Sequence, residues 1–177
     1  MPRTYRQRLE RSTLSESRFI VFLGVDMRPE ECPIRDAAHI LFSPSYTPLD
    51  FGEHRFNLDF YRHASLMITL PSLHDETIAP PGESVVILHC LTTKESLEQL
   101  RFDKDNGQET YKIVKKQITD ILIANAEKLL PRLSHKGEVQ LTASHNTLER
   151  YTLNSGGATV GWTCHPQEAF NRSVTGL

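Results

Sequence analysis

Runs of consecutive apolar residues dominate the first half of the chain. The first run, SRFIVFLGVD at 17–26, is rich in β-branched and aromatic side chains and is closed by Gly24 and Asp26. A continuous run of this length is typical of a buried strand. Four more segments carry a strand pattern, and the last of them alternates apolar and polar positions: 38–44, 65–72, 83–92 and 137–144. The sequence therefore predicts about five strands.

A helical pattern lies between the fourth and fifth of these segments. Between 110 and 130, apolar residues recur at steps of three and four, and Thr119 and several lysines fall on the opposite side. This spacing predicts one long helix with Thr110 as its N-cap and with its C-terminal end limited by Pro131. We expect its apolar stripe to cover a face of the sheet. The stripe consists of Val114, Ile118, Ile121, Leu122, Ala126 and Leu129.

Shorter helices are predicted at three places. The polar and aromatic stretch 45–63 shows no clean period, and we expect a loop with a short helix near its end. In 146–151, NTLERY, Asn146 is followed three residues later by Glu149, which is the spacing of a capping box. The segment PQEAFNR at 166–172 begins with a proline, which is well tolerated in the first turn of a helix.

These elements predict an α+β fold, with a mixed sheet of about five strands covered by one long helix and a few short helices. A length of 177 residues suits a single domain that spans 1–177. The hydrophobic content of 38% and the charged content of 24% are typical of a globular protein. A net charge of −2 gives no reason to expect nucleic acid as a partner.

The cysteine count and the terminal sequence bear on the compartment. Three cysteines are an odd number, and none of them has CxxC spacing, which fits a reducing environment. No apolar segment follows the basic N-terminus, and no run of about 18 apolar residues occurs anywhere. We therefore expect a cytoplasmic protein without a signal peptide or a spanning helix.

Candidate chemistry is sparse. The pairs His89-Cys90 and Cys164-His165 are adjacent residues, which point to opposite faces of a strand and cannot easily bind one metal ion. No nucleophile elbow or zinc motif occurs. The glycine-rich GGATVG at 156–161 is neither a dinucleotide-binding loop nor a P-loop. From the residues alone we predict no metal site and no catalytic residue.

Two motifs nevertheless have a distinctive character. One is PSLHDETIAPPG at 71–82, followed directly by an apolar strand, and the other is TLERYTLNSGGATVGW at 147–162. Together with FIVFLGVD at 19–26 they resemble, in this order, the phytoene-desaturase-like FAD-dependent oxidoreductases. That family includes carotenoid desaturases, carotenoid isomerases and retinol saturase. The resemblance covers nearly the whole chain.

The resemblance implies a role within a larger enzyme. Members of the family are longer and bind FAD through an N-terminal GxGxxG unit and a late glycine-rich segment, neither of which occurs in this sequence. The chain would then be the substrate-binding region of a FAD-dependent oxidoreductase of carotenoid biosynthesis, inactive alone, with FAD held by the remainder of its own chain. The alternative is a stand-alone module that binds an isoprenoid or other hydrophobic ligand, or an interaction domain.

The same resemblance implies site residues. Gly156, Gly157, Gly161 and Trp162 would lie near the flavin of the parent enzyme, unless the glycines only serve a tight turn and Trp162 is core. Relatives commonly carry an aromatic residue where this chain has Val160, so the substrate does not transfer from the family. Inward-facing strand residues would either line a substrate tunnel or form ordinary core beneath the helix. These are Phe19, Val21, Leu23, Met67, Ile68, Leu70, Val86 and Leu88.

Expectations about partners follow from the same family. The substrate would be a hydrophobic polyene or isoprenoid, and association of the parent enzyme with a membrane is compatible with such a substrate. A region separated from its flavin domain would expose the apolar surface that this domain covers. We therefore expect the chain on its own to self-associate through that surface.

Overall fold

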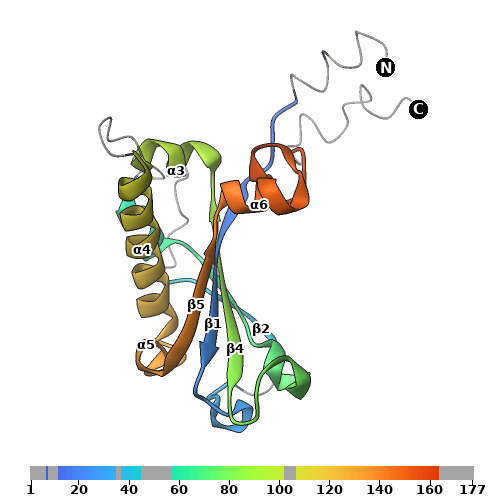
Figure 1. The fold of residues 1–177 in the computed structure, drawn as a ribbon, viewed down its shortest axis with the longest axis vertical. Helices are drawn as coiled ribbons and strands as arrows, with labels where there is room; N and C mark the ends of the chain where they lie inside the picture. The colour runs from blue at the N-terminus through green and yellow to red at the C-terminus, as the bar shows by residue number, and fades with distance from the viewer. Residues whose placement is uncertain (1–6, 8–11, 35–36, 45–56, 102–106, 164–177) are drawn as a thin grey trace, which may run out of the picture.

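A five-stranded antiparallel sheet forms the centre of the fold in the computed structural model (Figure 1). The structure describes the chain except for residues 1–6, 8–11, 35–36, 45–56, 102–106 and 164–177. The strand order is β2-β3-β4-β1-β5, and every neighbouring pair is antiparallel. The strands are β1 (Ser17–Val25), β2 (His39–Phe42), β3 (Leu66–Thr69), β4 (Ser84–Thr92) and β5 (Gly137–Ala143).

The structure confirms the expected α+β class and the five strands. The expectation of a mixed sheet was wrong, because every neighbouring pair of strands is antiparallel. The connection from β4 through the long helix to β5 joins two strands that run in the same direction, because both are antiparallel to β1. Since β1 lies between them, β4 and β5 do not pair with each other. The helical crossover therefore produces no parallel ladder.

The long helix α4 (Gly107–Ala126) lies along one side of the sheet, to the left of the strands in Figure 1. Its start at Gly107 places Thr110 inside the helix, so the expected N-cap was wrong. Hydrogen bonds from the backbone N–H groups of Leu129 and Leu130 to Ala126 O extend a final turn almost to Pro131. The helix therefore ends close to where the proline predicted.

The buried stripe of α4 largely matches the sequence pattern. Ile118, Leu122 and Ala126 are completely buried, and Ile121 is partly buried against the same core. Thr119 is also completely buried, although the pattern placed it on the polar side. Its hydroxyl donates to Lys115 O at 2.7 Å, so its only polar side-chain group is satisfied within the helix.

Four further α-helices and four 3-10 turns in the described residues frame the sheet. The short helix expected near the end of 45–63 is confirmed as α2 (Leu58–His63), whereas α3 (Lys94–Arg101) was not expected. The others are α5 (Leu133–Lys136), α6 (His145–Thr152), and the 3-10 turns η1 (Pro29–Glu31), η3 (Pro71–Leu73), η4 (Glu76–Ile78) and η5 (Ser155–Gly157). The helix predicted at 166–172 lies outside the described residues.

Helix α6 begins at a different cap from the predicted one. Ser144 is the N-cap, and its backbone N–H donates to Thr147 Oγ1 at 3.3 Å. Asn146 is therefore inside the helix, and the predicted Asn146–Glu149 capping box was wrong. The Glu149 carboxylate instead accepts from the backbone N–H of Gly156 at 2.9 Å. Glu149 thus fixes the loop after the helix rather than its beginning.

The hydrophobic core fills the space between α4 and the sheet. Tyr61 of α2 is completely buried there, its ring centroid lies 6.5 Å from that of Phe19, and its hydroxyl is 2.8 Å from Thr92 Oγ1. Burial raises the pKa of Tyr61, so the phenol remains neutral. Asn125 of α4 donates its side-chain amide to the backbone oxygens of Tyr61 and Arg62, at 3.2 and 3.1 Å. These hydrogen bonds connect α2 both to α4 and to β4.

Candidate functional site

The two faces of the sheet have different surroundings. Along β1 and β4, alternate residues are buried toward α4, and the residues between them face the other way. We call this other side the open face. In register, Ile20 of β1 lies opposite His89 of β4, His89 lies opposite Met67 of β3, and Met67 lies opposite Leu41 of β2. The open face therefore continues across four strands.

The open face is apolar although, within the described ranges, no helix covers it along most of its length. Phe22 in the inner strand β1 is 37% exposed, and Leu41 and Leu141 in the two edge strands are 76% and 64% exposed. An antiparallel sheet with one solvated face usually carries polar side chains there. A contiguous exposed apolar surface is instead typical of a site that binds a ligand or another chain.

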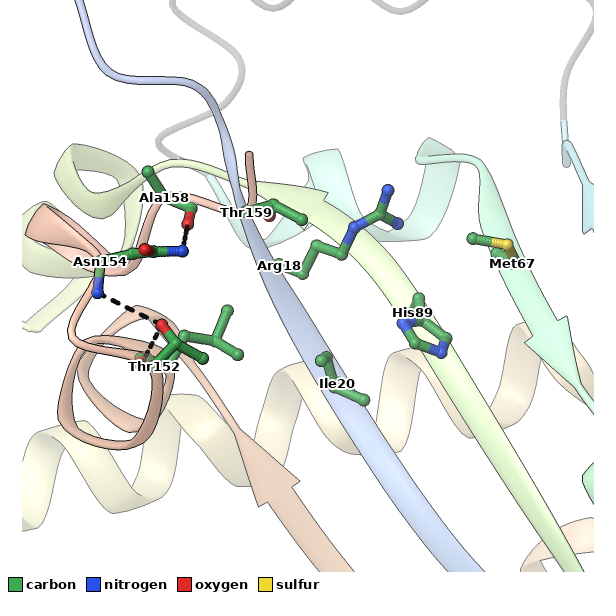
Figure 2. A pocket seen from close by; sticks show the side chains of 9 residues that line it. Arg18, Ile20, Met67, His89, Thr152, Asn154, Ala158 and Thr159 are labelled. Carbon is green, nitrogen blue, oxygen red and sulfur yellow. Dashed lines mark hydrogen bonds between the residues drawn. The ribbon is translucent and has the colours of Figure 1, made fainter. Parts of the chain in front are cut away.

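A pocket of about 330 Å³ lies at one end of the open face, where α6 and the following loop fold over the sheet. Figure 2 shows Arg18, Ile20, His89 and Met67 projecting from three strands toward this space. Most of the lining surface is apolar, as in sites that hold small hydrophobic ligands. The lining residues are Arg18, Ile20, Met67, His89, Leu148, Thr152, Asn154, Ala158 and Thr159.

Two hydrogen bonds shape the wall that α6 and its loop contribute. The Asn154 side-chain amide donates to Ala158 O at 3.0 Å, and the Asn154 backbone N–H donates to Thr152 Oγ1 at 3.3 Å (Figure 2). Both bonds close the turn on itself. The loop therefore offers the pocket a defined surface in which its own polar groups are largely satisfied.

The glycine-rich segment is held by the residues that precede β1. Ser17 Oγ donates to Gly157 O at 2.7 Å, and Thr159 N donates to Glu16 O at 3.0 Å. Further along, Ser15 N donates to Gly161 O at 2.9 Å. The segments 13–17 and 157–163, far apart in sequence, thus run side by side at the pocket end of the sheet.

Gly157 is required by a close approach within the chain itself. Its φ is +65°, and a Cβ built on it would lie 2.2 Å from His145 O, the backbone oxygen at the start of α6. Any side chain at this position would collide with that backbone. This contact explains the glycine without a cofactor, and the proximity of Gly157 to a flavin stays a prediction.

The other residues of the predicted flavin group differ in how open their surroundings are. Gly156 has a φ of +63°, and a Cβ built on it would lie 3.1 Å from Leu14 Cδ1, whereas Gly161 has a φ of +86° with no atom within 4 Å of such a Cβ. Trp162 is 43% exposed and forms an isolated bridge with Leu14, so it is not a core residue. Val160 is 71% exposed. Val160, Gly161 and Trp162 thus leave room for a neighbouring molecule.

The eight predicted substrate-contacting residues divide between the two faces. Met67 lines the pocket, and its side chain is half-buried. The pocket residues Ile20 and His89 were not among the predicted ones, because alternation does not indicate which face of a strand is covered. The remaining seven residues belong to the core under α4: Phe19, Val21, Leu23, Ile68, Leu70, Val86 and Leu88.

Two polar side chains of the pocket, His89 and Arg18, determine its electrostatic character. His89 Nδ1 is buried and accepts or donates no hydrogen bond in the described part of the chain. Burial lowers the pKa of His89, and the charges of Arg18 and His39 lower it further, so its imidazole is mostly neutral at pH 7. Among the lining residues Arg18 carries the only fixed charge, and no carboxylate lines the pocket.

The described residues show no site for a metal or for a nucleotide. No three His, Cys, Asp or Glu side chains among them are placed to share a metal ion. Within these same ranges no strand leads through a glycine-rich turn into a helix, which a dinucleotide site requires, and the glycine-rich segment instead follows α6.

Comparison with known proteins adds no family to this picture. No protein-family model matches the chain, and a search of curated proteins found no significant match. In the described ranges no helix combines the length and the apolar character that crossing a membrane requires.

Proposed function

We propose that this chain is the substrate-binding domain of a phytoene-dehydrogenase-like, FAD-dependent oxidoreductase that acts on a carotenoid or another polyene. The observation that carries the proposal is the apolar open face, which ends in an apolar pocket beneath α6. Because the opposite face packs against α4, the domain has its own core and does not need the open face for folding. The open face is therefore available for a ligand.

An elongated hydrocarbon fits this surface physically. Burial of each CH₂ group contributes about 0.8 kcal/mol, so a long chain gains substantially from lying along a row of apolar side chains. Such a row runs from Leu41 and Met67 into the pocket, and Phe22 and Ile87 form the next row. The domain would orient the polyene and keep water away from it, without carrying out the redox step itself.

The pairing of 13–17 with 157–163 supports a domain inserted into a larger one. The chain enters and leaves an inserted domain at neighbouring positions. Here the backbone of the segment before β1 is hydrogen-bonded to the segment after η5, beside the pocket. In the proposal, another part of the protein binds FAD next to this end, and the flavin supplies the acceptor for the electrons of the substrate.

The gene sequence on both sides of the chain offers a direct test. The protein expressed with its flanking sequences should be yellow and contain one FAD, whereas the chain of 177 residues alone should be colourless. The yellow protein should bleach when it is incubated anaerobically with its polyene substrate. A flanked protein that is colourless and binds a polyene all the same would contradict the oxidoreductase and favour a stand-alone hydrophobic-ligand module.

A further inference from the structure

The pocket at the end of the open face carries polar groups that a pure hydrocarbon would leave without partners. His89 Nδ1 is buried and unpartnered within the described ranges, and Arg18, whose side chain is half-buried, brings a positive charge to the same lining. A buried polar atom without a partner costs roughly 1–3 kcal/mol. The ligand that fills this pocket best therefore brings a hydrogen-bond partner to His89 and an anionic group to Arg18.

We propose that Arg18 and His89 form an anchor for the carboxylate of an otherwise apolar, elongated ligand whose hydrocarbon lies along the open face. This inference rests on the proposed function, because it concerns the same surface, and it adds the chemical class of the ligand's end group. Arg18 and His89 lie on neighbouring strands and project toward the same space (Figure 2). The ligand is therefore an amphiphile with one acidic end, such as a polyene carboxylic acid.

The charges of the pocket favour an anion over a neutral end group. Arg18 contributes a fixed positive charge, and none of the other lining residues is an Asp or a Glu that could neutralise it. A carboxylate can accept from the guanidinium with one oxygen and from an imidazole N–H with the other. Of the remaining polar residues, Asn154 and Thr152 already bond to each other and to the loop backbone. They are thus less available to a ligand.

The position of the anchor fits an extended ligand. Arg18 and His89 lie at the end of β1 and β4 that α6 covers, and the rows with Phe22 and Ile87 continue away from the pocket along the same face. A carboxylate held at this end would leave its hydrocarbon on the apolar side chains. The carboxylate of the ligand would then bind Arg18 and His89, and its hydrocarbon would pack on the apolar rows of the open face.

The test compares cis-parinaric acid with its methyl ester, which share one conjugated hydrocarbon chain and differ in the charge of the end group. Binding is followed at pH 7.5 by the increase of polyene fluorescence. We expect the acid to bind at least about tenfold more tightly than the ester, and Arg18→Gln to remove most of that preference by weakening the acid far more than the ester. Arg18→Lys should restore part of the preference.

A matched control removes the same charge elsewhere. Arg62→Gln alters an exposed arginine of α2 that pairs with Asp59, outside the pocket lining, and it should leave the preference for the acid intact. Equal binding of acid and ester to the wild type, or equal effects of Arg18→Gln and Arg62→Gln, would overturn the carboxylate anchor while the proposed polyene site stands. Failure of both ligands to bind would overturn the anchor and the proposed function together.

Discussion

Truncation of Phe19 to alanine is expected to lower the free energy of unfolding by about 3–5 kcal/mol. Phe19 is completely buried under α4 and meets the ring of Tyr61 edge to face, so the shorter side chain leaves a cavity in the centre of the core. Met67→Ala removes a half-buried side chain on the open face and should cost less than about 1 kcal/mol. Urea unfolding followed by circular dichroism measures both values.

The two variants should have the reverse order of effects on polyene binding, with the larger loss in Met67→Ala. Met67 lines the pocket, so Met67→Ala should weaken binding of a neutral polyene, whereas Phe19→Ala should bind normally at temperatures where it remains folded. Equal losses of stability in the two variants would contradict the division of the sheet into a core face and a ligand face. A stable Phe19→Ala protein with impaired binding would place the ligand beneath α4 instead.

Gly157→Ala is expected to destabilise the fold by about 2–5 kcal/mol, which combines a left-handed backbone with overpacking. The added methyl group would lie 2.2 Å from His145 O and 2.7 Å from His145 Cα, so the start of α6 or the loop must move. The same displacement should disturb the pocket wall that this loop forms. Thermal unfolding together with a polyene titration measures the two consequences.

Gly161→Ala is the matched control for this prediction. Its φ of +86° imposes a similar backbone cost, but no atom lies within 4 Å of the position of a Cβ. Its loss of stability should therefore be limited to about 1–2 kcal/mol. If both glycine variants lost the same stability, the contact of Gly157 with the backbone of His145 would not be the reason for this glycine.

Most of the fold could be predicted because strands and the long helix depend on periodic burial. The strand limits differ from the expected ones by a few residues at most, and the stripe through Ile118 and Leu122 is buried as the pattern indicates. The pairing of the sheet could not be predicted in this way. The order β4-β1-β5 places β1 between two strands that a helix connects, and nothing local in the sequence specifies that position.

The helix caps show a second limit of sequence patterns. Asn146 and Glu149 have the spacing of a capping box, but Ser144 two residues earlier caps α6 and Glu149 bonds to the loop. Several residues with capping side chains stand close together here, and the choice among them depends on where β5 ends. Tertiary contacts therefore decide a feature that looks local.

The candidate site could be predicted only in part for a similar reason. Strand alternation separates residues into two faces, but it does not say which face a helix covers, so seven of the eight predicted contact residues proved to be core and Met67 lines the pocket. Ile20 and His89 are direct sequence neighbours of core residues, but their side chains lie on the open face of the sheet. The turn that brings Asn154 and Thr159 over the sheet depends on contacts with the segment before β1.

The most direct test of the account is a titration of cis-parinaric methyl ester into the wild type, Phe22→Gln and Ile113→Gln. Phe22 lies in the middle of the open face and is 37% exposed, and Ile113 is a 53% exposed apolar residue on the outside of α4. The account predicts that Phe22→Gln weakens binding about tenfold, which corresponds to the loss of one large apolar contact, and that Ile113→Gln binds like the wild type. Equal affinities of all three proteins, with circular dichroism showing them folded, would contradict the assignment of the open face as the ligand surface.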